Sequence, residues 1–241
     1  MKKAYPWLGA LLLGCASVAA CGDAGGDSAP KDVDLSVEEV HDGAYQALSG
    51  PGVIHITARE LYEGNWFTFE TWVDMEAAQA RIELDGDVVG VISGGTFARW
   101  DGAHRTEKPI AEDLSDRDAM LFFALPHFRI LARAGDDADV RWDTVDGIAA
   151  IRLEVDALPG EVDDADGKIV LFLDGDFLPL RIEHLTRDST SVHRTYGEAS
   201  AVPRSELPAD FFSLDAVRDG EPDPLWDPPP EWSAELPSPS F

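Results

Sequence analysis

Side chains able to do nucleophilic or metal-binding chemistry are few in this chain. It has two cysteines, Cys15 and Cys21, and six histidines, at positions 41, 55, 104, 127, 184 and 193. The histidines lack the HExxH spacing of a zinc site, and "VISGG" at 91–95 lacks the glycine that a nucleophile elbow needs two residues before its serine. In "EVDDADG" at 161–167, valine and leucine fall on the first and twelfth ligand positions of a calcium loop. The sequence therefore predicts no enzyme, no metal site and no cofactor.

Cys21 is the one remaining candidate for chemistry, because the residues before it fit a processing site. Val18-Ala19-Ala20-Cys21 resembles a bacterial lipobox, in which the cysteine thiol receives a diacylglyceryl group and becomes the mature N-terminus. Small residues before the thiol suit the pocket of the processing peptidase. We predict Cys21 as the lipid-attachment residue. The alternatives are acylation at Cys15, which would leave an apolar start to the mature chain, and a plain secretory signal cut after Ala20.

The residues on both sides of Cys21 indicate export and attachment. Lys2 and Lys3 precede an apolar run, Trp7 to Ala20, that is shorter than the roughly 20 residues of a membrane-spanning helix. Residues 1–20 are therefore predicted to be a lipoprotein signal peptide, and residues 21–35, rich in Gly, Asp and Ser, a flexible tether. We expect an extracytoplasmic protein, lipid-anchored to the bacterial cell membrane or envelope.

The net charge restricts the partners that this chain is expected to have. Its 46 acidic and 19 basic residues give a formal net charge of −27. Such a surface repels nucleic acid and anionic headgroups, so neither is an expected partner by simple electrostatics. Residues 218–241 are rich in proline and acidic residues and include Trp226, Trp232 and Phe241, which predicts an extended tail. A protein partner could bind either to this tail or to the acidic surface.

Between these flanks, residues 36–217 are dominated by strand periodicity. Apolar residues alternate with polar ones in short segments joined by Gly-containing turns, which predicts one antiparallel meander. The expected strands lie near 54–59, 66–73, 80–84, 88–92, 96–100, 140–144, 148–156, 168–173, 180–183 and 191–198. One segment, Ser115 to Gly135, has helical spacing instead, and Pro126 inside it predicts a kink or two short helices. This helical segment is expected to cover one face of the sheet.

The order of these elements resembles the LolA/LolB-like superfamily, including its LppX/LprG-like anchored lipoproteins. The matching motifs are "LPLRIEH" (Leu178–His184) and "LPADFF" (Leu207–Phe212), which follow the mid-chain helical segment. The resemblance implies a mainly β (α+β) fold, in which a curved antiparallel sheet forms a half-barrel and mid-chain helices cover its open side. In this superfamily the apolar space between them holds acyl chains. A lipidated Cys21 favours the anchored members over soluble LolA.

The superfamily's cavity arginine has no clear counterpart in the sequence. Arg59, Arg81 and Arg99 all lie on expected strands, but their parity gives no common inward face. The mechanism of LolA is therefore not carried over to this chain.

Apolar residues on one face of the expected sheet and on the helical segment are the predicted lining of a lipid cavity. Burying an acyl chain there would gain about 0.8 kcal/mol per CH₂. The predicted lining residues are Phe67, Phe69, Ile82, Leu84, Met120, Phe123, Ile151, Leu153 and Val155. The predicted function is to bind or transfer a lipid or lipidated molecule. Alternatives are an RseB-like protein-interaction or stress-sensing domain, and a structural envelope lipoprotein whose apolar residues are simply its core.

Overall fold

A computed structural model describes residues 35–62, 64–100, 102, 104–110, 115–135, 138–158, 161–162 and 166–220. Cys21, the predicted signal peptide, the tether up to residue 34 and the tail from residue 221 lie outside these residues, so the attachment site and the domain boundaries stay predictions. Within the described part of the chain, no helix combines the length and the apolar character needed to cross a membrane.

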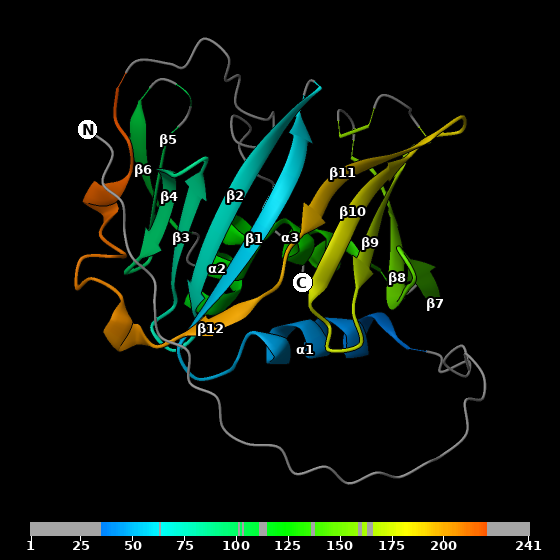
Figure 1. The fold of residues 1–241 in the computed structure, drawn as a ribbon, viewed down its shortest axis with the longest axis horizontal. Coiled ribbons are helices and arrows are strands. Elements are labelled where there is room, and N and C mark those ends of the chain that lie inside the picture. The colour runs from blue at the N-terminus through cyan, green and yellow to red at the C-terminus, as the bar shows by residue number, and fades with distance from the viewer. Residues whose placement is uncertain are drawn as a thin grey trace, which may run out of the picture.

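Twelve strands of the described chain form one antiparallel sheet, which confirms the predicted meander. The first half comprises β1 (Val53–Tyr62), β2 (Asn65–Asp74), β3 (Gln79–Leu84), β4 (Asp87–Ser93), β5 (Thr96–Trp100) and β6 (Arg105–Pro109). The second half comprises β7 (Asp139–Val145), β8 (Ile148–Asp156), β9 (Lys168–Leu173), β10 (Pro179–Leu185) and β11 (Thr190–Tyr196), with β12 (Ser200–Val202) beside β1. Their order is β6-β5-β4-β3-β2-β1-β11-β10-β9-β8-β7. β6 and β7 are the two edge strands of this sheet and do not pair with each other. The sheet is therefore open and forms an arch (Figure 1).

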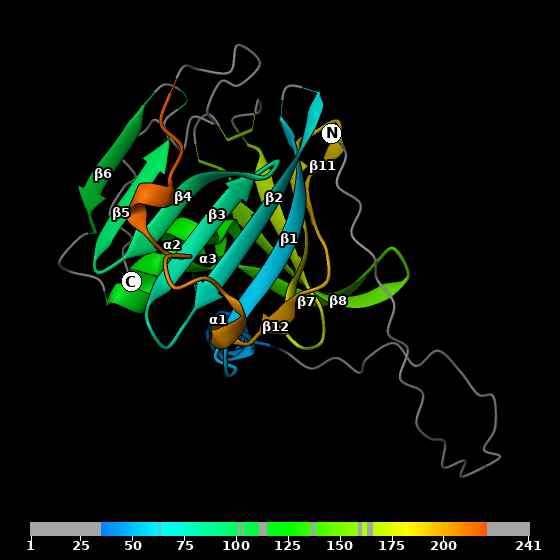
Figure 2. The ribbon, with the colours of Figure 1, turned by 60° about the vertical axis from the view of Figure 1, so that its left-hand side comes forward.

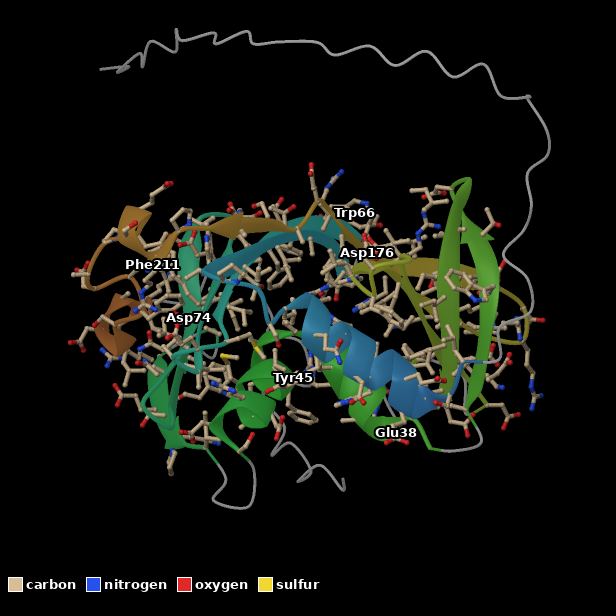
Figure 3. All side chains as sticks on the ribbon, turned by 90° about the horizontal axis from the view of Figure 1, so that it is seen from below. Glu38, Tyr45, Trp66, Asp74, Asp176 and Phe211 are labelled. Carbon is tan, nitrogen blue, oxygen red and sulfur yellow. The ribbon has the colours of Figure 1, made fainter. Side chains whose placement is uncertain are left out.

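Three helices lie on the concave side of this arch (Figures 1 and 3). They are α1 (Val37–Ala47), α2 (Asp116–Ala124) and α3 (Pro126–Arg133). The predicted break at Pro126 is confirmed, because Leu125 has an extended backbone and is both the C-cap of α2 and the N-cap of α3. The half-barrel with mid-chain helices on its open side is thus the observed fold class. The sequence analysis did not predict α1, β6 or β12.

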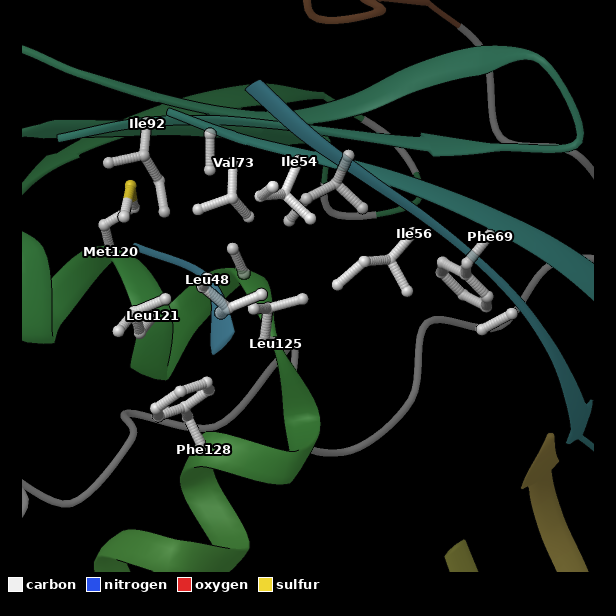
Figure 4. Packing of buried hydrophobic residues seen from close by; sticks show 14 of the residues in the cluster. Leu48, Ile54, Ile56, Phe69, Val73, Ile92, Met120, Leu121, Leu125 and Phe128 are labelled. Carbon is white, nitrogen blue, oxygen red and sulfur yellow. The ribbon is translucent and has the colours of Figure 1, made fainter. Parts of the chain in front are cut away.

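The core lies between the helices and the first half of the sheet. Figure 4 shows Met120 and Leu121 of α2, with Leu125 and Phe128, facing Ile92, Val73 and Ile54 on the strands. The same cluster continues onto the second half through the apolar residues of β8 and β9. One continuous apolar core therefore joins both halves of the sheet to its helical cover.

The "LPADFF" motif belongs to a C-terminal strap, residues 203–219, on the convex face of the first half (Figure 2). The strap contains two 3₁₀ turns, η1 (Arg204–Glu206) and η2 (Leu214–Ala216). Arg81 Nη1 donates to the carbonyl oxygen of Phe211 at 2.9 Å, and the Arg218 N–H donates to the carbonyl of Val88 at 2.8 Å. The motif therefore seals the outside of the half-barrel and does not line its interior.

Candidate ligand site on the concave face

Directly opposed residues form a row across the concave face, from β2 to β8. In order along the row, they are Phe67, Glu60, Arg194, Ile182, Leu171 and Leu153. A neighbouring row contains Leu84, Phe69, Ala58 and Tyr196. Apolar side chains therefore flank one charged pair, which lies where the two halves of the sheet meet.

All nine predicted lining residues belong to one apolar cluster. Those that are buried are Phe69, Ile82, Leu84, Met120, Ile151, Leu153 and Val155, while Phe67 and Phe123 are partly buried against them. The structure therefore brings together every residue that the strand and helix periodicities selected. Their role as the wall of a lipid cavity stays a prediction.

Two hollows are described, and neither is lined by any of these nine residues. A small one of about 10 Å³ lies among the three helices, next to Tyr45, Leu121 and Phe128. A wider groove of about 510 Å³ lies at the end of the sheet near Asp74 and Arg204. Neither of these two hollows therefore provides space for an acyl chain beside the nine residues.

Glu60 and Arg194 form an ion pair within the apolar surroundings of the concave face. Arg194 Nε donates to Glu60 Oε2 at 2.6 Å, and the two side chains are 7% and 6% exposed, Arg194 first. Burial opposes the charged form of Glu60, but Arg194, His193 and Arg129 outweigh it, so the pKa of this carboxyl lies below its ordinary value. Burial also opposes the charge on Arg194, and Glu60 outweighs it, so the pKa of Arg194 is raised.

A β-bulge brings a histidine to the same place. The register between β10 and β11 shifts after Ile182, so that Arg194 is opposite Ile182, Val192 is opposite Glu183, and His193 is the extra residue. A bulge re-aims side chains and is common beside functional sites. Here His193 Nε2 lies 3.6 Å from Glu60 Oε1, and its ring stacks on His184 with centroids 4.2 Å apart.

Helix α3 places His127 against Tyr196 of β11. The ring centroids are 5.8 Å apart and the rings are perpendicular. Burial and the nearby charge of Arg194 lower the pKa of His127 to about 3, so its imidazole is neutral at pH 7. Burial raises the pKa of Tyr196, against the effect of Arg194, so its phenol stays protonated. We call Glu60, Arg194, Tyr196 and His127 the polar centre.

Two polar atoms of the polar centre are buried without a regular hydrogen bond. Within the described residues, His127 Nδ1 has no hydrogen-bond partner, and the Tyr196 hydroxyl, which lies beside Arg194, has none with regular geometry. Each unsatisfied buried polar group costs about 1–3 kcal/mol, and such groups are uncommon in native cores. The polar centre is therefore more costly than an apolar core of the same shape.

Sequence reasoning missed the polar centre. It sought an inward arginine among Arg59, Arg81 and Arg99, but Arg81 contacts the strap on the convex face, and Arg59 stacks on the exposed Trp66 with its guanidinium 5.3 Å from the ring centroid. Arg99 does lie on the concave face, opposite Gly90 and on the side of Phe97, whereas the arginine where the two halves meet is Arg194. The spacing in "SVHRTYGE" places Arg194 on the same face as Tyr196, but the bulge at His193 puts Val192 on the other face, opposite Glu183.

No group of three or more His, Cys, Asp or Glu that could hold a metal ion occurs in the described parts of the chain. The stacked His184 and His193 lie beside Glu60 but do not form such a group. Burial, and then the charge of His193, lower the pKa of His184 to about 4, against Glu161 and Glu60. His184 is therefore neutral at pH 7.

Comparisons with known proteins find similar solved structures. No protein-family model matches the chain, and no curated protein sequence matches it. An uncharacterized conserved protein from Thermus thermophilus is 13% identical, with a TM-score of 0.47 over 73% of this chain and 91% of that one. LprF from Mycobacterium bovis is 14% identical, with a TM-score of 0.35 over 69% and 93%. A LolA superfamily protein from Nitrosomonas europaea is 10% identical, with a TM-score of 0.32 over 76% and 100%. Each of these three similarities has an identity below 15% and a TM-score below 0.5.

Proposed function

We propose that this chain is an extracytoplasmic lipoprotein, anchored at Cys21, which binds or transfers a lipid or lipidated molecule on the concave face of its half-barrel. One observation carries the proposal. The concave face is apolar across both halves of an open sheet, and its described cover consists of three helices of 11, 9 and 8 residues. Short separate helices can be displaced from a sheet at lower cost than a second sheet or a long helix.

The ligand is expected to enter between α2 and the sheet. On α2, Met120 has a flexible side chain that can adapt to a changed neighbour, and Phe123 is only partly buried. The ring centroid of Phe123 lies 5.5 Å from that of Phe97 on β5. The extended backbone at Leu125 ends α2 before α3 begins, so that a displacement of α2 does not require bending one continuous helix. An acyl chain would then replace helix–sheet contacts with contacts of the same apolar kind.

Uptake of a neutral fluorescent acyl-site probe, N-phenyl-1-naphthylamine, tests the proposal together with mass spectrometry of co-purified lipid. We expect uptake by the unmodified protein and a loss of about tenfold or more in Phe123→Asp, because a carboxylate at the helix–sheet contact disfavours an apolar ligand. Ile148→Asp is the matched control, since Ile148 is 52% exposed. Absence of both co-purified lipid and probe uptake would overturn the proposal.

Attachment is tested separately. Cys21→Ser is expected to abolish acylation and to release the protein from the membrane fraction, whereas Cys15→Ser leaves both unchanged. Release by Cys15→Ser in place of Cys21→Ser would move the attachment site, and release by neither would contradict the anchor.

A further inference from the structure

Strand β7 is an edge of the sheet whose outer side pairs with no other described strand. It pairs with β8 and is the outermost strand at one end of the arch (Figure 1). Such an edge offers a row of backbone donors and acceptors to another strand. The Thr144 N–H donates to Asp143 Oδ1 at 2.7 Å, so it points away from β8. Since alternate residues of a strand present their backbone groups to the same side, those of Val140, Trp142 and Thr144 face outward.

The two edges of the sheet differ in how they are protected. β6 ends in Pro109 and carries Lys108, and a side chain of the strap accepts from the N–H of its first residue. Proline, lysine and a covering segment are common means of keeping an edge from pairing. β7, with the sequence DVRWDTV, contains neither proline nor lysine. Its charged residues, Asp139, Arg141 and Asp143, instead alternate with uncharged ones. β7 is therefore the edge that is left available for pairing.

The charges of β7 are complementary to those of a second, antiparallel β7. A two-fold pair centred on Trp142 uses all seven residues of the strand and places Arg141 of each copy opposite Asp143 of the other. Opposite charges that face each other across an antiparallel pair stabilise it, and like charges destabilise it. Moving the centre by one residue, to Arg141 or to Asp143, would place two arginines or two aspartates opposite each other. The centre at Trp142 also pairs the outward backbone groups of Val140 with those of Thr144.

Both charged side chains are accessible to a second copy. The Arg141 side chain is 51% exposed and that of Asp143 is 44% exposed. Arg141 pairs with Asp139 on the same strand, and Asp143 Oδ2 lies 3.8 Å from Arg152 Nε on β8. Exposed ion pairs of this kind contribute little to stability, so a partner across the interface can be added or exchanged at low cost.

We propose that β7 is a self-association edge, on which a second copy of this chain adds its own β7 as an antiparallel strand. The two open sheets would then continue into each other, with both concave faces on the same side, because the two-fold axis of such a pair is perpendicular to the sheet. The inference goes beyond the proposed function and needs no bound lipid. One seven-residue edge is a small interface, so we expect weak association, which a shared membrane surface strengthens by raising the local concentration.

Energy transfer between donor-labelled and acceptor-labelled full chains measures the association. The label is attached through Asp176→Cys, in the exposed turn before β10. The acylated chain is studied in neutral phosphatidylcholine vesicles, and a chain without acylation in buffer. About 0.15 M salt screens the repulsion expected from the net charge of −27. The unmodified sequence should associate as its concentration rises. Arg141→Asp and Asp143→Arg should each weaken association by about tenfold, because each brings two like-charged pairs together.

The two single variants are complementary to each other. When they are mixed, two aspartates of one copy lie opposite two arginines of the other, so association should recover to within about threefold of the unmodified protein. The double variant Arg141→Asp/Asp143→Arg exchanges the charges and should recover with itself. Arg187→Asp, in the β10–β11 turn with a side chain 72% exposed, makes the same charge change away from β7 and should leave association unchanged.

Thr144→Pro tests the backbone contact. Because the Thr144 N–H faces away from β8, proline there removes an outward donor and no ladder bond, so association should be lost with little change in the melting temperature. Three results would each overturn the inference: no association of the unmodified chain, association that survives Arg141→Asp, or no recovery when the two single variants are mixed. Loss in each single variant with recovery in the mixture supports it.

Discussion

Glu60 and Arg194 are 134 residues apart in the chain and form a buried ion pair across the ladder that joins the two halves of the sheet. The guanidinium of Arg194 also lies 4.7 Å from the ring centroid of Phe69. The pair therefore links the first half of the sheet to the second through two charged side chains. A buried pair is rarely the most stable solution, because desolvation offsets the Coulomb attraction.

Replacing one residue of this pair is predicted to destabilise the protein much more than replacing both residues together. Glu60→Met or Arg194→Met should lower the free energy of unfolding by about 3–5 kcal/mol, since each leaves the other side chain buried without the counter-charge that it pairs with. The double variant Glu60→Met/Arg194→Met should recover most of that loss. Urea denaturation of the four proteins measures the coupling. A double variant as unstable as the sum of the single ones would contradict this account.

Acid is predicted to destabilise the protein through His127. Its pKa is about 3 in the folded state against 6.5 for an ordinary histidine, so the unfolded chain binds the proton first. The stability it contributes is complete above pH 6.5 and is lost as the pH falls toward 3. At about pH 5 the loss is on the order of 2 kcal/mol.

A variant isolates this contribution. His127→Phe keeps a ring against Tyr196 but cannot take up a proton, so its melting temperature should fall less than that of the unmodified protein between about pH 8 and about pH 5. Glu60, whose pKa is lowered, contributes in the same direction at lower pH, and this part persists in the variant. Parallel melting curves for the two proteins would show that His127 is not buried in its neutral form.

Gly43 is predicted to be required where α1 meets the loop between β9 and β10. A Cβ built on Gly43 would lie 2.5 Å from the ring carbons of Phe177. Gly43→Ala should therefore cost about 1–3 kcal/mol of unfolding free energy through overpacking, although alanine is the better helix former. Adding Phe177→Ala should remove the clash, and Gly50→Ala, whose Cβ would lie 4.0 Å from Ile54, should be tolerated. Thermal unfolding distinguishes these cases.

The elements that could be predicted from the sequence are those with one regularly buried face. Strands such as β3, with alternating buried and half-buried residues, were predictable because one face enters the core. The edge strand β6 is half-buried or exposed throughout and lacks that alternation, and β12 has three residues. In α1 the buried residues within the helix are Val40 and Ala44, too few for a strong helical signal.

The candidate site was predictable in its apolar part and not in its polar part. Periodicity identified the nine apolar residues because each lies on a regular strand or helix. The pairing of Glu60 with Arg194 depends instead on which strands are neighbours, and the bulge at His193 shifts the parity within β11. Local spacing contains neither kind of information.

The C-terminal strap is predicted to stabilise the domain through Phe212. This ring is 5% exposed, and the guanidinium of Arg204 lies 4.8 Å from its centroid while pairing with Asp74. Phe212→Ala should lower the free energy of unfolding by about 3 kcal/mol, the usual cost of deleting a buried ring. Leu207→Ala, in the same segment and partly buried, is the control and should cost about 1 kcal/mol or less.

Trp72 reports on the same contact, because it lies under the strap with its ring centroid 5.4 Å from that of Phe211. Loss of Phe212 should loosen the strap and raise the exposure of Trp72 to an aqueous fluorescence quencher before global unfolding. If Phe212→Ala costs no more than Leu207→Ala and leaves quenching unchanged, the strap does not belong to the cooperative unit. If the strap instead unfolds together with the sheet, it stabilises the first half of the sheet from the convex face. The helices on the concave face could then be displaced while the strap keeps the strands in place.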